Sequence, residues 1–414
     1  MPASFPRTGC GRGKAAVFPL LILLFGILSG CADSGSSTED TDWQYTMVYP
    51  NNWFTLQEVS DGYFCQSGET VYFIDRGTRE IVPLCTRFGC LHGAEPDFSA
   101  RLACSAYFPV SSMSNCFSVS ENRLYTAIAA DGPSQEVLQV DPDGQNRRVL
   151  CRFTDGEQVR AVLAHRGTLY LLISFYDENL VLHDRVCTLR LSSQNQTPAV
   201  LYTAEAGTDI ESLAAFDRFL YLRFRADGDA ATGLLRLDPA SGETLALSLP
   251  DAGWSPISLT FAGNRLLITA APAEDAPDRL LRKLYSCAPD GSDVRELRTD
   301  YGLCASDGER IYWLRFFLPS YDSYAVPADG DALVILHTDG AELDRVPLAG
   351  LAGERYDRLL CHELFPSAGG TVILALFVTD PEHPEGYHLL YTFPKSEIGS
   401  GAITPEFLCG VPLR

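Results

Sequence analysis

Three cysteines and one histidine stand close together near residue 90 and offer the donor atoms of a metal site. They are Cys85, Cys90, His92 and Cys104, in the pattern Cys-x4-Cys-x-His-x11-Cys. Cys90 and His92 are two residues apart, so in an extended segment both side chains point to the same side. Three thiolates and an imidazole suit tetrahedral zinc, and a closed set of four leaves no open position for a substrate. The pattern therefore predicts a structural zinc site.

Two other interpretations of these residues stay open. The spacing matches neither a standard zinc finger nor a zinc ribbon, and it lacks the Cys-x-x-Cys-His of covalently bound haem. In an exported protein a disulfide could join two of the three cysteines, or one of them and Cys65. Free thiols are the third possibility. The cysteines in strand-like segments are expected to be buried small apolar residues; they are Cys116, Cys187, Cys287, Cys304 and Cys361.

A short β-rich segment recurs along the chain and predicts the frame that positions these residues. It occurs at 70–74, 123–127, 168–172, 219–223, 265–269, 310–314 and 371–375. Hairpins with Pro, Asp and Gly in their turns follow, as in 137–150 and 234–246. Four short antiparallel strands at a period of about 45–50 residues are typical of a propeller blade. We predict an all-β fold, a single β-propeller over residues 43–414, most simply with seven four-stranded blades. Six or eight blades, or two β-sandwiches, are the alternatives.

The frame also predicts where the cysteine and histidine residues lie. We name the strands of a blade A to D from the channel outward, so that the B–C and D–A connections emerge on one face and the A–B and C–D turns on the other. With 70–74 as strand B of blade 1, residues 79–84 become strand C and residues 105–110 strand D. The four residues are then expected in the C–D connection of blade 1, on the face opposite the B–C loops.

The first thirty residues have the features of an export signal. Arg7, Arg12 and Lys14 precede an apolar run over 15–28. As a helix, that run would rise about 21 Å, which is short of the roughly 30 Å hydrocarbon core and favours a secretory signal peptide. The run ends in Leu-Ser-Gly before Cys31, which resembles the bacterial lipobox. We predict a signal peptide at 1–30 and a lipid on Cys31, the alternative being an uncleaved anchor with a chance cysteine.

Composition limits the partners of the mature chain. Residues 31–42 are small, polar and acidic, and they predict a flexible tether behind the lipidated cysteine. Removing the three positive charges of the signal peptide from a net charge of −21 leaves −24. Such an acidic surface repels nucleic acid, so we do not expect nucleic-acid binding. Two acyl chains on the cysteine would suffice for lasting membrane attachment.

Long B–C connections predict a ligand surface. They cover 175–184, 271–283, 316–331 and 379–388 in blades 3, 5, 6 and 7, whereas most C–D turns look tight. Scaffolds carry function on loops that vary, so we expect the B–C face and the channel mouth to bind ligand. The candidate ligand-binding residues are Phe175, Tyr176, His183, Phe316, Phe317, Tyr321, Tyr324, His383 and Tyr387. Aromatic rings suit sugars or peptide segments, although each ring could instead pack on neighbouring loops.

Catalysis is the competing hypothesis, and few residues favour it. The chain contains neither Gly-x-Ser-x-Gly nor His-Glu-x-x-His. His183 with Asp184, and His383 with Glu385 and His388, could act as general acid and base groups. A propeller lyase or hydrolase of extracellular polymer requires that such groups meet in one cleft.

The lipobox, the acidic tether, the Cys/His stretch and the repeated strands resemble a group of uncharacterised Gram-positive lipoproteins, whose C-terminal part is similar to the TolB-type propeller. The matching residues are Cys31, Cys85, Cys90, His92, Cys104 and Tyr107. The gap over 93–103 is longer than the resemblance implies. The resemblance implies a lipid-anchored, extracytoplasmic propeller, and it carries over no catalytic residues.

The expected function is therefore that of a monomeric binding scaffold held at the cell membrane through Cys31. Its partner would be a glycan, a peptide or an envelope protein, bound through the B–C loops. Structural zinc is the only cofactor that the sequence suggests, and an enzyme acting on extracellular polymer is the alternative.

Overall fold

The computed structural model describes residues 54–92, 95, 97–109, 117–130, 134–154, 156–191, 197–226, 232–273, 276, 278–315, 332–348, 351, 358–367, 369–380 and 383–413, with only the backbone at 358–363, 380 and 383–385. The chain divides into two units, Met1–Thr41 and Asp42–Arg414, and every described residue belongs to the second. The predicted signal peptide, Cys31 and the tether thus lie outside the described residues. Within the described part of the chain, no helix is long and apolar enough to cross a bilayer.

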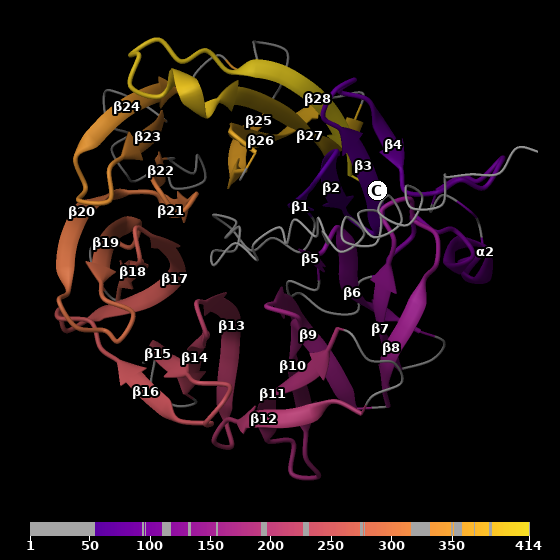
Figure 1. The fold of residues 1–414 in the computed structure, drawn as a ribbon, viewed down its shortest axis with the longest axis horizontal. Helices are drawn as coiled ribbons and strands as arrows, with labels where there is room; N and C mark the ends of the chain where they lie inside the picture. The colour runs from indigo at the N-terminus through magenta and orange to yellow at the C-terminus, as the bar shows by residue number, and fades with distance from the viewer. Residues whose placement is uncertain are drawn as a thin grey trace, which may run out of the picture. The chain divides into compact units, whose positions relative to one another are not determined.

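Seven four-stranded antiparallel sheets form a ring, which confirms the predicted propeller and its blade number (Figure 1). Blade 1 contains β1 (Phe54–Val59), β2 (Gly62–Ser67), β3 (Thr70–Asp75) and β4 (Ile81–Pro83); blade 2 contains β5 (Phe117–Ser120), β6 (Arg123–Ala129), β7 (Gln135–Val140) and β8 (Arg148–Phe153). Blade 3 contains β9 (Glu157–His165), β10 (Thr168–Tyr176), β11 (Leu182–Arg190) and β12 (Ala199–Thr203); blade 4 contains β13 (Thr208–Phe216), β14 (Phe219–Ala226), β15 (Thr232–Leu237) and β16 (Thr244–Leu247).

The remaining blades follow the same order, each from one continuous stretch of chain. Blade 5 contains β17 (Trp254–Ala262), β18 (Arg265–Pro272), β19 (Leu281–Cys287) and β20 (Arg295–Tyr301). Blade 6 contains β21 (Leu303–Ser306), β22 (Ile311–Arg315), β23 (Ala332–Leu336) and β24 (Glu342–Pro347). Blade 7 contains β25 (Arg358–Pro366), β26 (Thr371–Asp380), β27 (His383–Pro394) and β28 (Glu406–Pro412). The helical turns described are α2 (Phe98–Leu102) and η1 (Lys395–Glu397).

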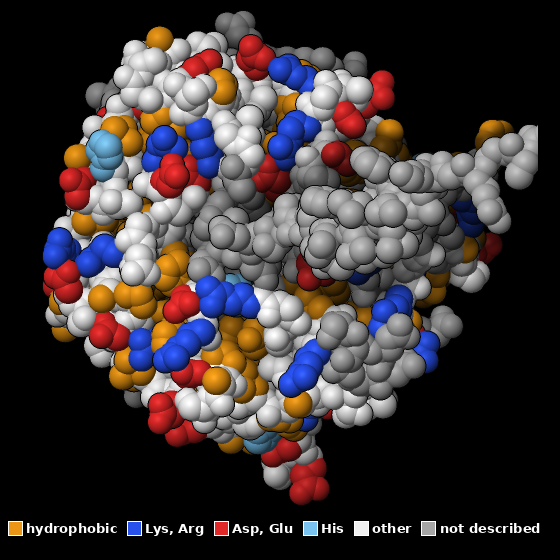
Figure 2. Space-filling model, in the orientation of Figure 1, with side chains coloured by type: hydrophobic (Ala, Val, Ile, Leu, Met, Phe, Trp, Pro, Cys, Tyr) orange, Lys and Arg blue, Asp and Glu red, His pale blue; other side chains and the backbone are white. Residues whose placement is uncertain are grey.

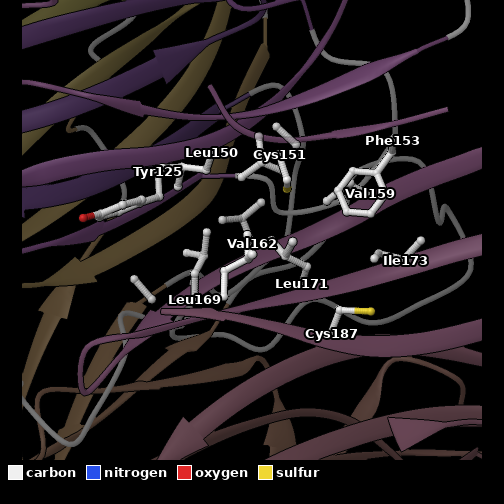
Figure 3. Packing of buried hydrophobic residues seen from close by; sticks show 14 residues of the cluster. Tyr125, Leu150, Cys151, Phe153, Val159, Val162, Leu169, Leu171, Ile173 and Cys187 are labelled. Carbon is white, nitrogen blue, oxygen red and sulfur yellow. The ribbon is translucent and has the colours of Figure 1, made fainter. Parts of the chain in front are cut away.

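The core of the protein lies between blades rather than within them. Because strand side chains alternate between the two faces of a sheet, a blade buries both faces only when neighbours cover them. Between blades 2 and 3, for example, Leu150 and Cys151 of β8 pack with Val162 of β9 and Leu171 of β10 (Figure 3). All five residues of the middle strand β22 are therefore buried.

Blade 1 begins one strand earlier than the sequence indicated. The segment at 70–74 lies in β3, the third strand of its sheet, and β2 is the second. Residues 105–109 form no strand; Tyr107 makes a single bridge to Thr70. The prediction of a C–D connection for the Cys/His residues is therefore wrong. The hairpin of β1 and β2, joined by the tight turn at 60–61, supplies the first two strands of blade 1. β3 and β4 are therefore its last two strands, and the Cys/His residues lie in the D–A connection between β4 and β5.

Loop lengths also differ from the predicted pattern. In blade 3, β10 and β11 pair out to Tyr176 and Leu182, which leaves a short turn at 177–181. In blade 7, β26 and β27 are separated only by 381–382, because paired strands occupy most of the predicted loop. Long B–C connections remain at 273–280 in blade 5 and 316–331 in blade 6, and the latter lies outside the described residues. The C–D connection at 395–405 is itself long, so the predicted contrast between the two faces is wrong.

Candidate metal centre

The four predicted ligands converge in the structure. One ligand atom from each of Cys85, Cys90, His92 and Cys104 lies within 4.8 Å of all the others. The Cys104 sulfur is 3.9 Å from Nδ1 of His92. In a tetrahedral zinc site, sulfur–sulfur and sulfur–nitrogen distances are about 3.8 and 3.6 Å, so small adjustments of the side chains would complete the site.

Local backbone geometry brings these residues together. After β4 ends, the N–H of Leu84 donates to Val71 (2.9 Å) and keeps the chain beside β3. Gly89 then takes a φ of 70°, a left-handed conformation that glycine adopts without strain. His92 also has a positive φ, of 53°. That conformation is uncommon for a residue with a side chain, and it is found preferentially at functional sites.

The centre sits at the seam between blades 1 and 2. Cys90 and Cys104 belong to an apolar cluster that includes Val71 of blade 1 and Leu138 of blade 2. Figure 1 shows α2, which precedes Cys104, at the outer side of the ring. A metal ion here would tie the long connection down against both blades.

The three thiols differ in their electrostatic surroundings. Burial alone would raise the pKa of Cys85, but hydrogen bonds to its sulfur from Arg87 and Ser105 bring that pKa down to about 6. Burial raises the pKa of Cys90, and it raises the pKa of Cys104 to about 12. A bound cation would favour the thiolate form of all three, because a metal ligates the deprotonated sulfur.

Glu95 is a further member of the centre that the sequence did not single out. Its carboxylate oxygen Oε1 accepts hydrogen bonds from the Cys90 thiol (3.1 Å) and the N–H of Leu91 (2.8 Å). Arg87 forms an ion pair with the same oxygen at 3.4 Å. These contacts hold the Cys90–His92 segment in place. The sequence places two acidic residues, Glu95 and Asp97, in the gap between His92 and Cys104 and does not distinguish them.

The other described cysteines lie apart from the four clustered residues and do not pair with them. No disulfide joins any of the nine cysteines that the structure describes. Cys65 belongs to the apolar cluster between blades 7 and 1, a different part of the core. Cys187, Cys287 and Cys304 are buried, as predicted. Cys116 and the side chain of Cys361 lie outside what the structure describes.

The predicted ligand residues of blade 3 form one small stack. The rings of Phe175 and His183 are stacked at 5.2 Å, and Nε2 of His183 lies 3.2 Å from the carboxylate of Asp177. Tyr176 is 64% exposed beside them. His183 is therefore held by its own turn, and Tyr176 is the ring that is available to a partner.

In blade 7, His388 is the one predicted acid–base group whose side chain is described, and it does not face a ligand. His388 is buried in the core, where its ring stacks on Phe54 at 4.0 Å and lies 5.3 Å from Phe377. Tyr387 is half-buried in β27, where it pairs with Pro412. These residues pack because β27 starts earlier than predicted. Phe316, Phe317, Tyr321 and Tyr324 lie outside the described residues, as do the side chains of His383 and Glu385.

Asp184 connects blades instead of partnering His183. Its carboxylate accepts a hydrogen bond from the N–H of Ile210 in blade 4 (2.6 Å) and lies 3.4 Å from Arg160. Burial raises the pKa of Asp184. Acidic and basic side chains lie next to one another around the ring in Figure 2. The candidate catalytic groups whose side chains are described, His183, Asp184 and His388, do not meet in one cleft.

Comparisons with known proteins identify the fold alone. No family model matches the chain, and no curated protein matches it. An oligogalacturonate lyase solved with manganese is 12% identical, with a TM-score of 0.52 over 86% of this chain and 97% of that one. A second oligogalacturonate lyase, from Vibrio parahaemolyticus, is 11% identical, with a TM-score of 0.50 over 83% and 94%. A TolB protein from Agrobacterium tumefaciens is 10% identical, with a TM-score of 0.41 over 63% and 86%. At these identities the likeness is one of architecture, and the seven sheets identify the chain as a seven-bladed β-propeller.

Proposed function

We propose that this protein is a lipid-anchored, extracytoplasmic binding scaffold whose first two blades are fixed together by a structural zinc ion. The observation that carries the zinc proposal is the convergence of the ligand atoms of Cys85, Cys90, His92 and Cys104 within 4.8 Å. The metal would be closed off by four protein ligands, so it would hold structure and not activate a substrate.

The donor set selects the metal. Thiolates favour zinc, whereas manganese prefers oxygen ligands, so the manganese of the lyase relative does not suit this site. Zinc also explains why three cysteines and a histidine share one small volume, since a disulfide would use only two of the sulfurs.

The scaffold proposal rests on the arrangement of the remaining candidates. His183 pairs with Asp177, Asp184 bridges blades and His388 packs on Phe54. Asp177 and His183 form a pair within one turn, and Asp184 and His388, the other candidates whose side chains are described, do not join it. A binding role needs no such cluster of titratable groups, because an accessible ring such as that of Tyr176 is enough to contact a partner. The proposed partner is a glycan, a peptide segment or an envelope protein.

The metal proposal is tested by metal analysis of protein purified without added zinc, paired with a thiol count in denaturant and chelator. We expect one equivalent of zinc and no loss of thiols. A metal-free protein with two thiols missing would establish a disulfide and overturn the proposal. Replacement of Cys104 by Ser should abolish zinc binding, whereas the same replacement at buried Cys287 should leave it intact.

Anchoring and binding need separate experiments. Mass spectrometry of the N-terminal peptide from membranes should find a lipid on Cys31, and Cys31→Ser should leave the chain unprocessed. Glycan and peptide arrays should yield a ligand whose binding weakens in Tyr176→Ala. Degradation of an extracellular polymer that is lost in His183→Ala would instead establish the enzyme alternative.

A further inference from the structure

Arg147 reaches from blade 2 across the seam to the metal-binding segment. It ends the turn at 141–147 between β7 and β8. Its Nη2 donates hydrogen bonds to the carbonyl oxygens of Ser105 (2.5 Å) and Tyr107 (3.1 Å), which lie one and three residues after Cys104. The guanidinium also lies over the ring of Phe108, 4.3 Å from its centre. One side chain of blade 2 thus holds the backbone that carries the last ligand.

The turn at 141–147 also contacts the residues on either side of Cys85, the first of the four ligands. Nε2 of Gln145 donates to the Thr86 hydroxyl at 2.6 Å. Gly144 has a φ of +77°, and a Cβ at this position would lie 2.4 Å from the carbonyl oxygen of Leu84. The close approach therefore requires glycine. The turn at 141–147 packs against residues that flank both Cys85 and Cys104.

The charge of Arg147 needs a counterpart inside the seam. Burial lowers the pKa of Arg147 to about 10. Its Nε–H is buried and has no hydrogen-bond partner in the part of the chain that is described. A buried cationic group is costly unless negative charge lies nearby.

A zinc ion with three thiolates and a neutral histidine supplies that charge. Three sulfurs at −1 and a zinc ion at +2 leave the centre with a net charge of −1. Two other arginines lie beside the centre and have partners of their own: Arg87 forms an ion pair with Glu95, and Arg101 lies over the rings of Phe98 and Tyr107. Arg147 differs from both because it comes from blade 2.

We propose that Arg147 is the counter-charge of an anionic zinc–thiolate centre, so that zinc binding and the docking of blade 2 on blade 1 stabilise each other. This inference rests on the proposed zinc site. Arg147 is a positioning residue, since it acts on the ligands and not on the metal. By linkage, zinc should tighten the seam, and a docked seam should raise zinc affinity.

The test compares Arg147→Met, Arg147→Lys and a matched control, Arg152→Met. Arg152 lies on β8 of the same blade, and its exposed side chain pairs with Glu136. Zinc affinity is measured against a competing chelator. Loss of a partner outside the ligand shell typically lowers metal affinity by about 10–100-fold. We expect a loss of this size in the methionine variant, substantial recovery in the lysine variant and no change in the control.

Two further readouts separate charge from packing. The sulfur-to-metal charge-transfer band of the cobalt-loaded protein should shift in Arg147→Met and return toward the wild-type position in Arg147→Lys. Removing zinc from the wild type should speed amide hydrogen exchange within 141–147, on the far side of the seam. Equal loss of zinc affinity in the lysine and methionine variants would overturn the inference. So would an Arg101→Met variant that loses as much zinc affinity as Arg147→Met.

The two proposals can fail separately. A wild-type chain without zinc contradicts the proposed metal site itself. A wild type that holds zinc, with an Arg147→Met variant of equal affinity and unchanged exchange at 141–147, contradicts only the role of Arg147.

Discussion

The hydroxyl of Ser67 donates a hydrogen bond of 2.8 Å to the carbonyl oxygen of Pro412, 345 residues further along the chain. This contact joins the second strand of blade 1 to the last strand of blade 7. The ring therefore closes without exchanging a strand between its first and last blades, since each is built from consecutive strands. Closure depends on side-chain packing and on hydrogen bonds such as this one.

Packing at this closing seam should dominate its stability. Phe54 is fully buried there and stacks on His388. Removing a buried phenylalanine side chain costs about 3–5 kcal/mol, so Phe54→Ala should lower the free energy of unfolding by that amount in chemical denaturation. Phe407 on β28 is 52% exposed, and Phe407→Ala is the matched control with a loss below about 1 kcal/mol. Equal losses of unfolding free energy in the two variants would show that packing at the closing seam does not dominate stability.

The seam hydrogen bond should make a smaller contribution. Ser67→Ala leaves the Pro412 carbonyl without this donor, and a net loss of about 1 kcal/mol is typical for such a bond. Urea denaturation of the two proteins measures the difference. A stability equal to the wild type would mean that water or another group replaces the hydroxyl.

A buried ion pair between blades 6 and 7 predicts sensitivity to acid. Lys395 lies 2.7 Å from the carboxylate of Asp307, whose side chain is 1% exposed, and the Tyr312 hydroxyl donates to the same oxygen at 2.7 Å. Burial alone would raise the pKa of Asp307, but these partners outweigh it and hold the pKa below the usual 3.8. The folded value lies below the unfolded one, so this stabilisation is present above pH 4 and is lost as the pH falls through the folded pKa.

Asp307→Asn tests this pair. Removing one partner leaves the Lys395 charge buried and uncompensated, which costs about 3–5 kcal/mol. We expect lower stability at pH 7 and a weaker dependence on pH below 4 than in the wild type. Asp217 makes an exposed pair with Arg166, so Asp217→Asn should change stability by less than about 1 kcal/mol. Parallel pH profiles of the wild type and Asp307→Asn would contradict the prediction.

The buried thiols should be inert in the folded protein. Burial raises the pKa of Cys151 and Cys409 to about 12 and that of Cys287 to about 11. A thiol reacts as the thiolate, so alkylation at pH 8 should reach these residues only after unfolding. Peptide mapping after a short pulse of iodoacetamide, with and without denaturant, measures this. Labelling of Cys287 at equal rates in both conditions would show that blade 5 opens in the native state.

Local sequence was sufficient for the repeat and for the donor atoms of the metal site. Tight turns with Pro, Asp and Gly mark the hairpins whatever surrounds them, because their backbone conformations are intrinsic to those residues. The same locality explains the error in blade 1. A β-rich segment at 70–74 looks alike as a second or a third strand, and only the pairing of β3 between β2 and β4 assigns it.

The sequence by itself predicted a propeller, most simply of seven blades, and the four residues able to hold a metal, since periodicity, turn chemistry and donor type are all local properties. Tertiary structure decided which blades the metal centre joins, that Glu95 and Arg147 surround it, and that His388 packs in the core instead of facing a ligand. Those outcomes depend on contacts between segments that lie far apart in the chain. The free energy of such contacts comes from burial and charge at seams that exist only once the ring has closed.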